Sequence, residues 1–240
     1  MSLHANWATW LRILLYLHIA CGVTGFICAP VALLTAKGGK THRRWGKIYF
    51  WAMAGVAVTA LILSFALPIF FLAMVAVFSF YAAFSGYRIL YLKDIIKGAP
   101  ASFYDWAFAL VTLLSSALLF VMGFWRPRLM HVGLIQITGH TVSIVSIVFG
   151  CIGISLALGS IRRFLKPPNH RMFWWFDHMQ GMIASYIAAM TAFSAVNLSR
   201  WFGAAWWVWL WPTILGVPTI AIWTAYYQKK FAASRIKTTT

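Results

Sequence analysis

The sequence is short of acidic residues. It contains no glutamate and only three aspartates, Asp94, Asp105 and Asp177, among 240 residues. Hydrolysis by general acid–base chemistry commonly needs paired carboxylates, and cation-coupled transport commonly needs a buried one. The sequence also has no P-loop, no GxSxG motif and no HExxH motif. These absences argue against hydrolytic enzymes and against transport coupled through a buried acid.

Cysteine is also scarce. Cys21, Cys28 and Cys151 all lie inside apolar runs, and they form neither a CxxC pair nor the framework of a small secreted protein. We interpret them as small buried hydrophobic side chains.

Charged residues make up 10% of the chain, whereas soluble domains have about 25%. Hydrophobic residues reach 62%, and the mean hydropathy is +0.80. An α-helix needs about 20 apolar residues to cross a bilayer. The sequence therefore predicts one all-α membrane domain over residues 1–240, a bundle of seven transmembrane helices. The seven predicted spans are 10–35, 46–66, 69–92, 103–124, 133–158, 173–197 and 204–227. Ser102 followed by Asp105 predicts the start of the fourth span.

The basic residues predict the orientation of these spans. With the N-terminus outside, sixteen of the 20 Lys and Arg residues lie at the cytoplasmic ends of the spans or in the tail, and four lie outside. Because positive charge is retained on the cytoplasmic side, this split predicts a cytoplasmic C-terminus. We interpret the net charge of +17 as topogenic charge facing anionic lipid and not as a nucleic-acid site. The expected location is a bacterial cytoplasmic (inner) membrane, with multiple passes.

Four histidines stand out by their depth in the predicted spans. His18 and His140 lie in the outer parts of spans one and five, about 12 Å and 10 Å from the outer edge. His42 lies at the entrance of span two, and His178 about 8 Å into span six. Spans one and five are parallel, as are spans two and six, so we expect one histidine pair near each membrane face. His170 is the alternative inner ligand, because a faint internal duplication makes it the counterpart of His42.

Small or polar residues follow these histidines at helical spacing. Such residues leave a flat recess beside an imidazole, and a porphyrin held by two axial imidazoles needs one. The alternative is close packing of helices through small residues, with the histidine hydrogen-bonded across the interface. The expected recess residues are Gly22 and Gly25 after His18, Gly181 and Ser185 after His178, and Gln136 and Ser143 around His140.

Pairs of imidazoles favour haem over zinc, because zinc needs three or four ligands at one point. The propionates of a haem would need cations at the membrane edges. Arg43, Arg44 or Arg171, together with Lys47, can serve inside, although their role in topology already explains them. Arg12, Arg126, Arg128 and His131 are the corresponding outer residues.

Three segments resemble a bacterial family of predicted membrane proteins of unknown function. They begin at His18 (HIACG), at Lys37 (KGGKTHRRWGKIY) and at His178 (HMQGMIASYIAAMTAF). The KGxxxHRxxGxxY element is the more specific of the matches. The resemblance implies a membrane protein and no particular activity. The two histidine pairs are similar in pattern to the di-haem transmembrane cytochromes b, although those proteins have a four-helix core.

The leading hypothesis is therefore a b-type cytochrome with two haems, one between His18 and His140 and one between His42 and His178. Such a protein moves electrons across or within the membrane, with a quinol or a soluble reductant as donor. Two alternatives stay open. One is a transporter or channel for a small solute, and the other is a non-catalytic membrane subunit or sensor.

Overall fold

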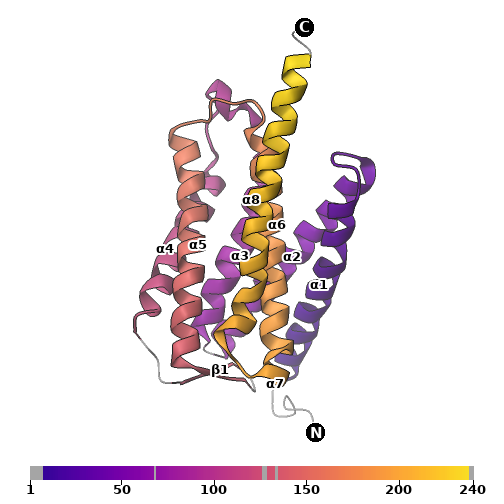
Figure 1. Ribbon diagram of the computed structural model, residues 1–240. Helices are drawn as coiled ribbons and strands as arrows, with labels where there is room; N and C mark the ends of the chain where they lie inside the picture. The colour runs from indigo at the N-terminus through magenta and orange to yellow at the C-terminus, as the bar shows by residue number, and fades with distance from the viewer. Residues whose placement is uncertain (1–7, 68, 126–128, 133–134, 238–240) are drawn as a thin grey trace.

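The structure, a computed structural model, describes residues 8–67, 69–125, 129–132 and 135–237, and it is almost entirely helical (Figure 1). Seven of the helices in this part of the chain are long and apolar enough to span a bilayer. The predicted all-α bundle of seven spans is confirmed, and the chain is a multi-pass membrane protein. The long helices are α1 (Thr9–Leu34), α2 (Lys40–Ala66), α3 (Phe70–Arg88), α4 (Phe103–Met122), α5 (Gly139–Leu165), α6 (Phe173–Asn197) and α8 (Trp206–Lys237).

Helices α3 and α6 pack against each other in the middle of the bundle. The α1–α2 hairpin lies on one side of them, α4 and α5 lie on the other, and α8 packs along α6 and α5 (Figure 1). Rings from three helices fill the centre: Phe71 of α3 meets Trp209 of α8, and Phe78 of α3 meets Phe149 of α5. Many large apolar side chains point outward instead, as expected where lipid replaces water as the solvent.

One end of the bundle carries most of the positive charge, and we call it the basic end. It holds the loops α1–α2, α3–α4 and α5–α6 and the end of α8, at the top of Figure 1. The α3–α4 loop contains two short 3-10 helices, Ile89–Tyr91 and Lys93–Lys97. At the opposite end lie the short helix α7 (Ser199–Phe202) and a hairpin of β1 (Leu129–Val132) and β2 (Ile135–Thr138).

Two predicted helix starts differ from the structure. Helix α2 begins at Lys40 and not at 46, because Gly39 caps it in extended conformation and the basic segment that follows is helical. Helix α5 begins at Gly139 and not at 133, because the chain before it pairs as the β1–β2 hairpin. The Thr138 hydroxyl accepts a hydrogen bond from the Thr141 N–H and so caps α5. The predicted start of span four is confirmed by a capping box of Ser102 and Asp105.

Two partly buried ion pairs connect neighbouring helices near the basic end. Arg88 of α3 forms a bidentate ion pair with Asp105 of α4, with N–O distances of 2.8 and 3.1 Å. Arg163 of α5 bonds Asp177 of α6 at 2.6 Å. Two of the three acids in the sequence therefore link helices to one another.

Helices α3 and α6 approach most closely at two glycines. A Cβ on Gly86 would lie 2.9 Å from the Met182 nitrogen, and one on Gly181 would lie 2.7 Å from the Gly86 Cα. These separations leave no room for a side chain, so both positions need glycine if the helices are to stay in contact.

This contact yields a stability prediction. Gly86→Ala forces α3 and α6 apart, and we expect it to lower the free energy of unfolding by about 1–3 kcal/mol, the usual cost of overpacking. Gly22→Ala is the matched control, because a Cβ there meets nothing within 4 Å. The measurement is thermal unfolding of both variants in the same detergent. Equal midpoints for the two variants would show that the glycine contact is not needed.

Candidate functional site

His42 is held by the end of the preceding helix. Gly38 has a φ of +77°, which turns the chain sharply between α1 and α2. This turn brings the His42 Nδ1 to 2.9 Å from the carbonyl oxygen of Ala32. The Lys37 ammonium donates to the carbonyl of Leu33, and partial burial lowers the pKa of that ammonium. The last carbonyls of a helix have no partner within the helix, so these two side chains cap α1.

His178 is held by the neighbouring helix α3. Its Nδ1 lies 2.7 Å from the carbonyl oxygen of Gly86, just before α3 gives way to the 3-10 turn at Ile89–Tyr91. The close approach of Gly86 and Gly181 brings this carbonyl within reach of the ring. The contact between α3 and α6 therefore sets the position of His178.

The two hydrogen bonds show which nitrogen of each ring carries a hydrogen. A carbonyl oxygen only accepts, so each Nδ1 must carry the hydrogen. In a neutral imidazole the Nε2 atom then has a free lone pair. Neither Nε2 atom is hydrogen-bonded to another residue in the described part of the chain. This arrangement is typical of histidines that bind a metal through Nε2 while a carbonyl orients the ring.

The rings of His42 and His178 lie side by side. Their centres are 6.1 Å apart and their planes are inclined at 80°. Two imidazoles that bind one iron from opposite sides have ring centres about 6 Å apart, since each metal–nitrogen bond is about 2 Å and each ring adds about 1 Å. The observed separation is close to this spacing, and it also falls within the range of an ordinary edge-to-face contact between two rings.

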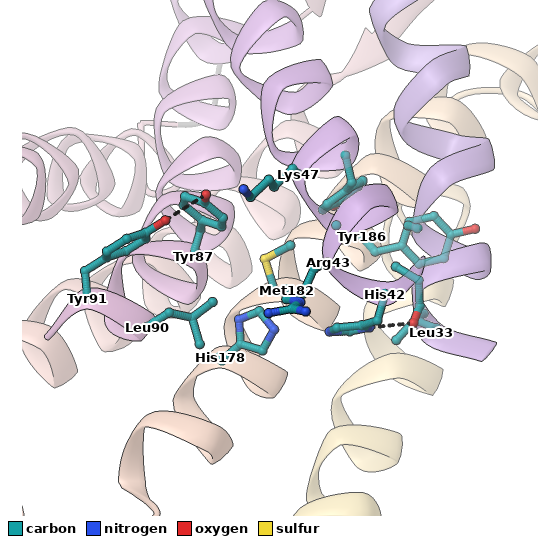
Figure 2. Close-up of a pocket in the computed structure, with 14 residues that line it drawn as sticks. Leu33, His42, Arg43, Lys47, Tyr87, Leu90, Tyr91, His178, Met182 and Tyr186 are labelled. Atoms are coloured by element: carbon teal, nitrogen blue, oxygen red, sulfur yellow. Dashed lines mark hydrogen bonds between the residues drawn. The ribbon is translucent and has the colours of Figure 1, made fainter. Parts of the chain in front are cut away.

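A cavity of about 280 Å³ opens beside the two rings, between α1, α2, α3 and α6. Its walls are mainly apolar, and Arg43 and Lys47 supply cations (Figure 2). No acidic side chain lines it among the described residues. The cavity is suited to a ligand with an apolar body and negative groups at its edge. The lining residues are Ala29, Ala32, Leu33, His42, Arg43, Gly46, Lys47, Tyr49, Tyr87, Leu90, Tyr91, His178, Met182 and Tyr186.

A second contact lies deeper between the same helices. Tyr49 follows His42 by seven residues, and Ser185 follows His178 by seven. Because α2 and α6 both run inward from the basic end, these positions meet about 10 Å below the histidines. The Tyr49 hydroxyl donates to the Ser185 Oγ at 2.6 Å, since that Oγ gives its own hydrogen to the Met182 carbonyl. The contact keeps α2 and α6 in register.

The structure thus brings together part of the predicted inner site. His42, His178 and Arg43 lie at one cavity, and Ser185 lies below it. Gly181 packs against α3 and does not form a recess for a ligand. The other inner candidates, Arg44, His170 and Arg171, are exposed and do not line the cavity.

The predicted outer pair of His18 and His140 is not brought together. Helix α1 lies on the α2 side of the bundle and α5 on the α4 side (Figure 1). The His18 Nδ1 bonds the Thr59 Oγ of α2 at 2.9 Å. His140 is the second residue of α5 and is exposed, whereas His18 lies nine residues into α1, about 14 Å deep. The depths of the two rings therefore do not match.

The predicted outer recess is missing for the same reason. Gly25 packs on Met53 and Tyr49 of α2, and Gly22 has open space beside it. Ser143 is half-buried on α5 and far from α1 in the fold. Gln136 belongs to strand β2 and not to a helical stripe, and its side chain lies outside the described part of the structure, as does that of His131. Arg126 and Arg128 lie outside the described residues as well.

Several lining residues escaped the sequence analysis. Tyr87, Met182 and Tyr186 belong to the cavity, and the Tyr87 hydroxyl lies 3.1 Å from that of Tyr91. The deeper contact could have been predicted from spacing, because Tyr49 follows His42 by seven residues and Ser185 follows His178 by seven. Tyr87 and Tyr91 carry no comparable signal, because neither α3 nor the 3-10 turn after it contains a histidine.

The donor set at this cavity consists of two imidazoles. No three side chains of His, Cys, Asp or Glu come together among the residues that the structure describes. This part of the chain therefore offers no site of the three- or four-ligand kind that zinc needs. A haem iron already has four porphyrin nitrogens, so two axial imidazoles complete its coordination.

Comparison with known proteins adds no identity: no family model, no curated protein and no solved structure matches the chain. The geometry of this site is therefore the basis for inferring a function.

The Tyr49 contact yields a prediction. Tyr49→Phe removes one buried hydrogen bond, and we expect it to lower the free energy of unfolding by about 1 kcal/mol. Tyr104→Phe is the control, because that ring is exposed at the start of α4. Thermal unfolding measures both. An unchanged midpoint for Tyr49→Phe would mean that the contact does not hold α2 and α6 together.

Proposed function

We propose that the chain is a b-type membrane cytochrome that binds one haem between His42 and His178. The observation that carries the proposal is the pair of Nε2 lone pairs on rings 6.1 Å apart. The sequence pattern favoured two haems. The proposal now has one, because the outer pair of histidines is separated in the fold.

The residues of the site have distinct parts in this proposal. His42 and His178 would hold the haem through their Nε2 atoms, and the carbonyls of Ala32 and Gly86 orient the two rings. Arg43 and Lys47, which line the cavity, would offset the negative charge of the propionates. The mainly apolar walls would limit the access of water to the haem. A haem held in this way supplies reversible one-electron transfer.

The basic end sets the side on which electrons would enter or leave. By the positive-inside rule this end faces the cytoplasm, so the proposed haem lies in the cytoplasmic half of a bacterial inner membrane. One haem near one face serves electron transfer at that face, with a quinol in the bilayer or a soluble reductant as the partner. The cavity lies between helices near the basic end.

The visible spectrum tests the proposal. We expect the protein, expressed with an ample supply of haem, to show a Soret band and about one haem per chain. His42→Gly should lose most of the bound haem, because one axial bond is removed. Added imidazole should restore the band by filling the space left by the side chain.

Two matched controls sharpen this test. His18→Ala and His140→Ala should both retain the full band, because neither residue lies at the cavity. A pigment-free protein that is folded and monodisperse would rule out the proposal. Loss of the band in His18→Ala but not in His42→Gly would place the ligand elsewhere.

A further inference from the structure

A second, much smaller cavity lies among α3, α4 and α5 near the basic end. Its volume is about 20 Å³. Arg88 and Arg163, the two arginines of the ion pairs described above, are among the residues that line it. A cavity needs about 10–15 Å³ to hold one water molecule. The polar residues on its walls are Tyr81, Ser85, Arg88, Asp105, Ser160 and Arg163.

One donor at this cavity has no partner. The Nε–H of Arg163 is buried and makes no hydrogen bond to any residue in the described part of the chain. The other nitrogens of this guanidinium are occupied, since Nη1 bonds Asp177 at 2.6 Å and Nη2 contacts the Ser160 Oγ at 3.4 Å. Leaving a buried N–H of a charged group without a hydrogen bond lowers the stability of the fold.

One acceptor that lines the same cavity can take a further hydrogen bond. Asp105 is 1% exposed, and its Oδ1 accepts a single hydrogen bond, from the Arg88 Nε. Its Oδ2 already accepts from the Arg88 Nη2 and from the amide and hydroxyl of Ser102. Each carboxylate oxygen can accept about two hydrogen bonds, so Oδ1 has a lone pair left.

We propose that this cavity binds one water molecule, which accepts from the Arg163 Nε–H and donates to the Asp105 carboxylate. The water joins the two ion pairs into one network from Arg88 to Asp177, across α3, α4, α5 and α6. Asp177 directly precedes His178, so the network also holds the start of the helix that carries this histidine. The site does not depend on the proposed haem.

A structure at a resolution that shows ordered solvent gives the direct test. We expect a single density peak within hydrogen-bond distance of the Arg163 Nε and of one Asp105 oxygen. An empty cavity would overturn the proposal. Crystals grown in bromide distinguish an anion from water, because an anomalous peak at this position would also overturn it.

A thermal double-variant cycle tests the link in solution. Asp105→Asn and Asp177→Asn should combine non-additively, with the double variant differing from the summed midpoint shifts by about 2 °C or more. Arg163→Lys keeps the positive charge but removes the Nε–H, and in that background the two shifts should add. If the two midpoint shifts are still non-additive in the Arg163→Lys background, the two sites are coupled through charge alone. That result would contradict a bridging water.

Two controls accompany the cycle. Arg162→Lys makes the same change at the adjacent exposed position, and the coupling should survive it. Asp94→Asn combined with Asp177→Asn should be additive, because Asp94 pairs with Lys97 at the surface. Loss of the coupling in Arg162→Lys would mean that the effect does not come from the Arg163 Nε.

Discussion

The hydrogen bonds from two imidazole Nδ1 atoms to helix carbonyls determine what this site can do. Each bond fixes a ring and leaves its Nε2 lone pair unused. The two carbonyls become available for different reasons: Ala32 lies in the last turn of α1, and Gly86 lies just before α3 tightens into a 3-10 turn. Carbonyl groups at or near helix ends therefore orient the rings of His42 and His178 and leave their Nε2 atoms available.

The bilayer explains why so much of this geometry is set at helix ends. Backbone groups within the hydrocarbon must bond each other, so free carbonyls concentrate where helices terminate. The same end of the bundle carries the Arg88–Asp105 and Arg163–Asp177 ion pairs, which hold four neighbouring helices. The contact of Gly86 with Gly181 then places α6 against α3. The ion pairs, the free carbonyls and the contact between Gly86 and Gly181 all lie towards the basic end of the molecule.

The fold was largely predictable because its dominant signal is simple. Runs of about 20 apolar residues must be helical in lipid, and this rule found all seven long helices. It failed at residues 135–138, which were predicted as the start of span five and form strand β2, because a short apolar run fits a helix or a strand equally well. That error placed His140 about 10 Å into span five, whereas it lies in the first turn of α5. The lengths of α2 and α8 were underestimated, since both extend beyond their apolar parts.

The candidate site was predictable only in part. His42 and His178 lie on parallel helices at similar depth, and this was enough to pair them. The same reasoning paired His18 with His140, but depth says nothing about which helices are neighbours. The prediction needed spans one and five to be neighbours, yet α1 packs mainly on α2. Side chains from α3, such as Tyr87, reach the cavity only through tertiary packing.

Electron paramagnetic resonance of the oxidised protein tests the central claim most directly, because iron with two axial imidazoles is low-spin. The account predicts a purely low-spin ferric signal for the native chain and a high-spin signal for whatever haem His42→Ala retains. A high-spin signal from the native chain, or an unchanged low-spin signal from His42→Ala, would contradict it.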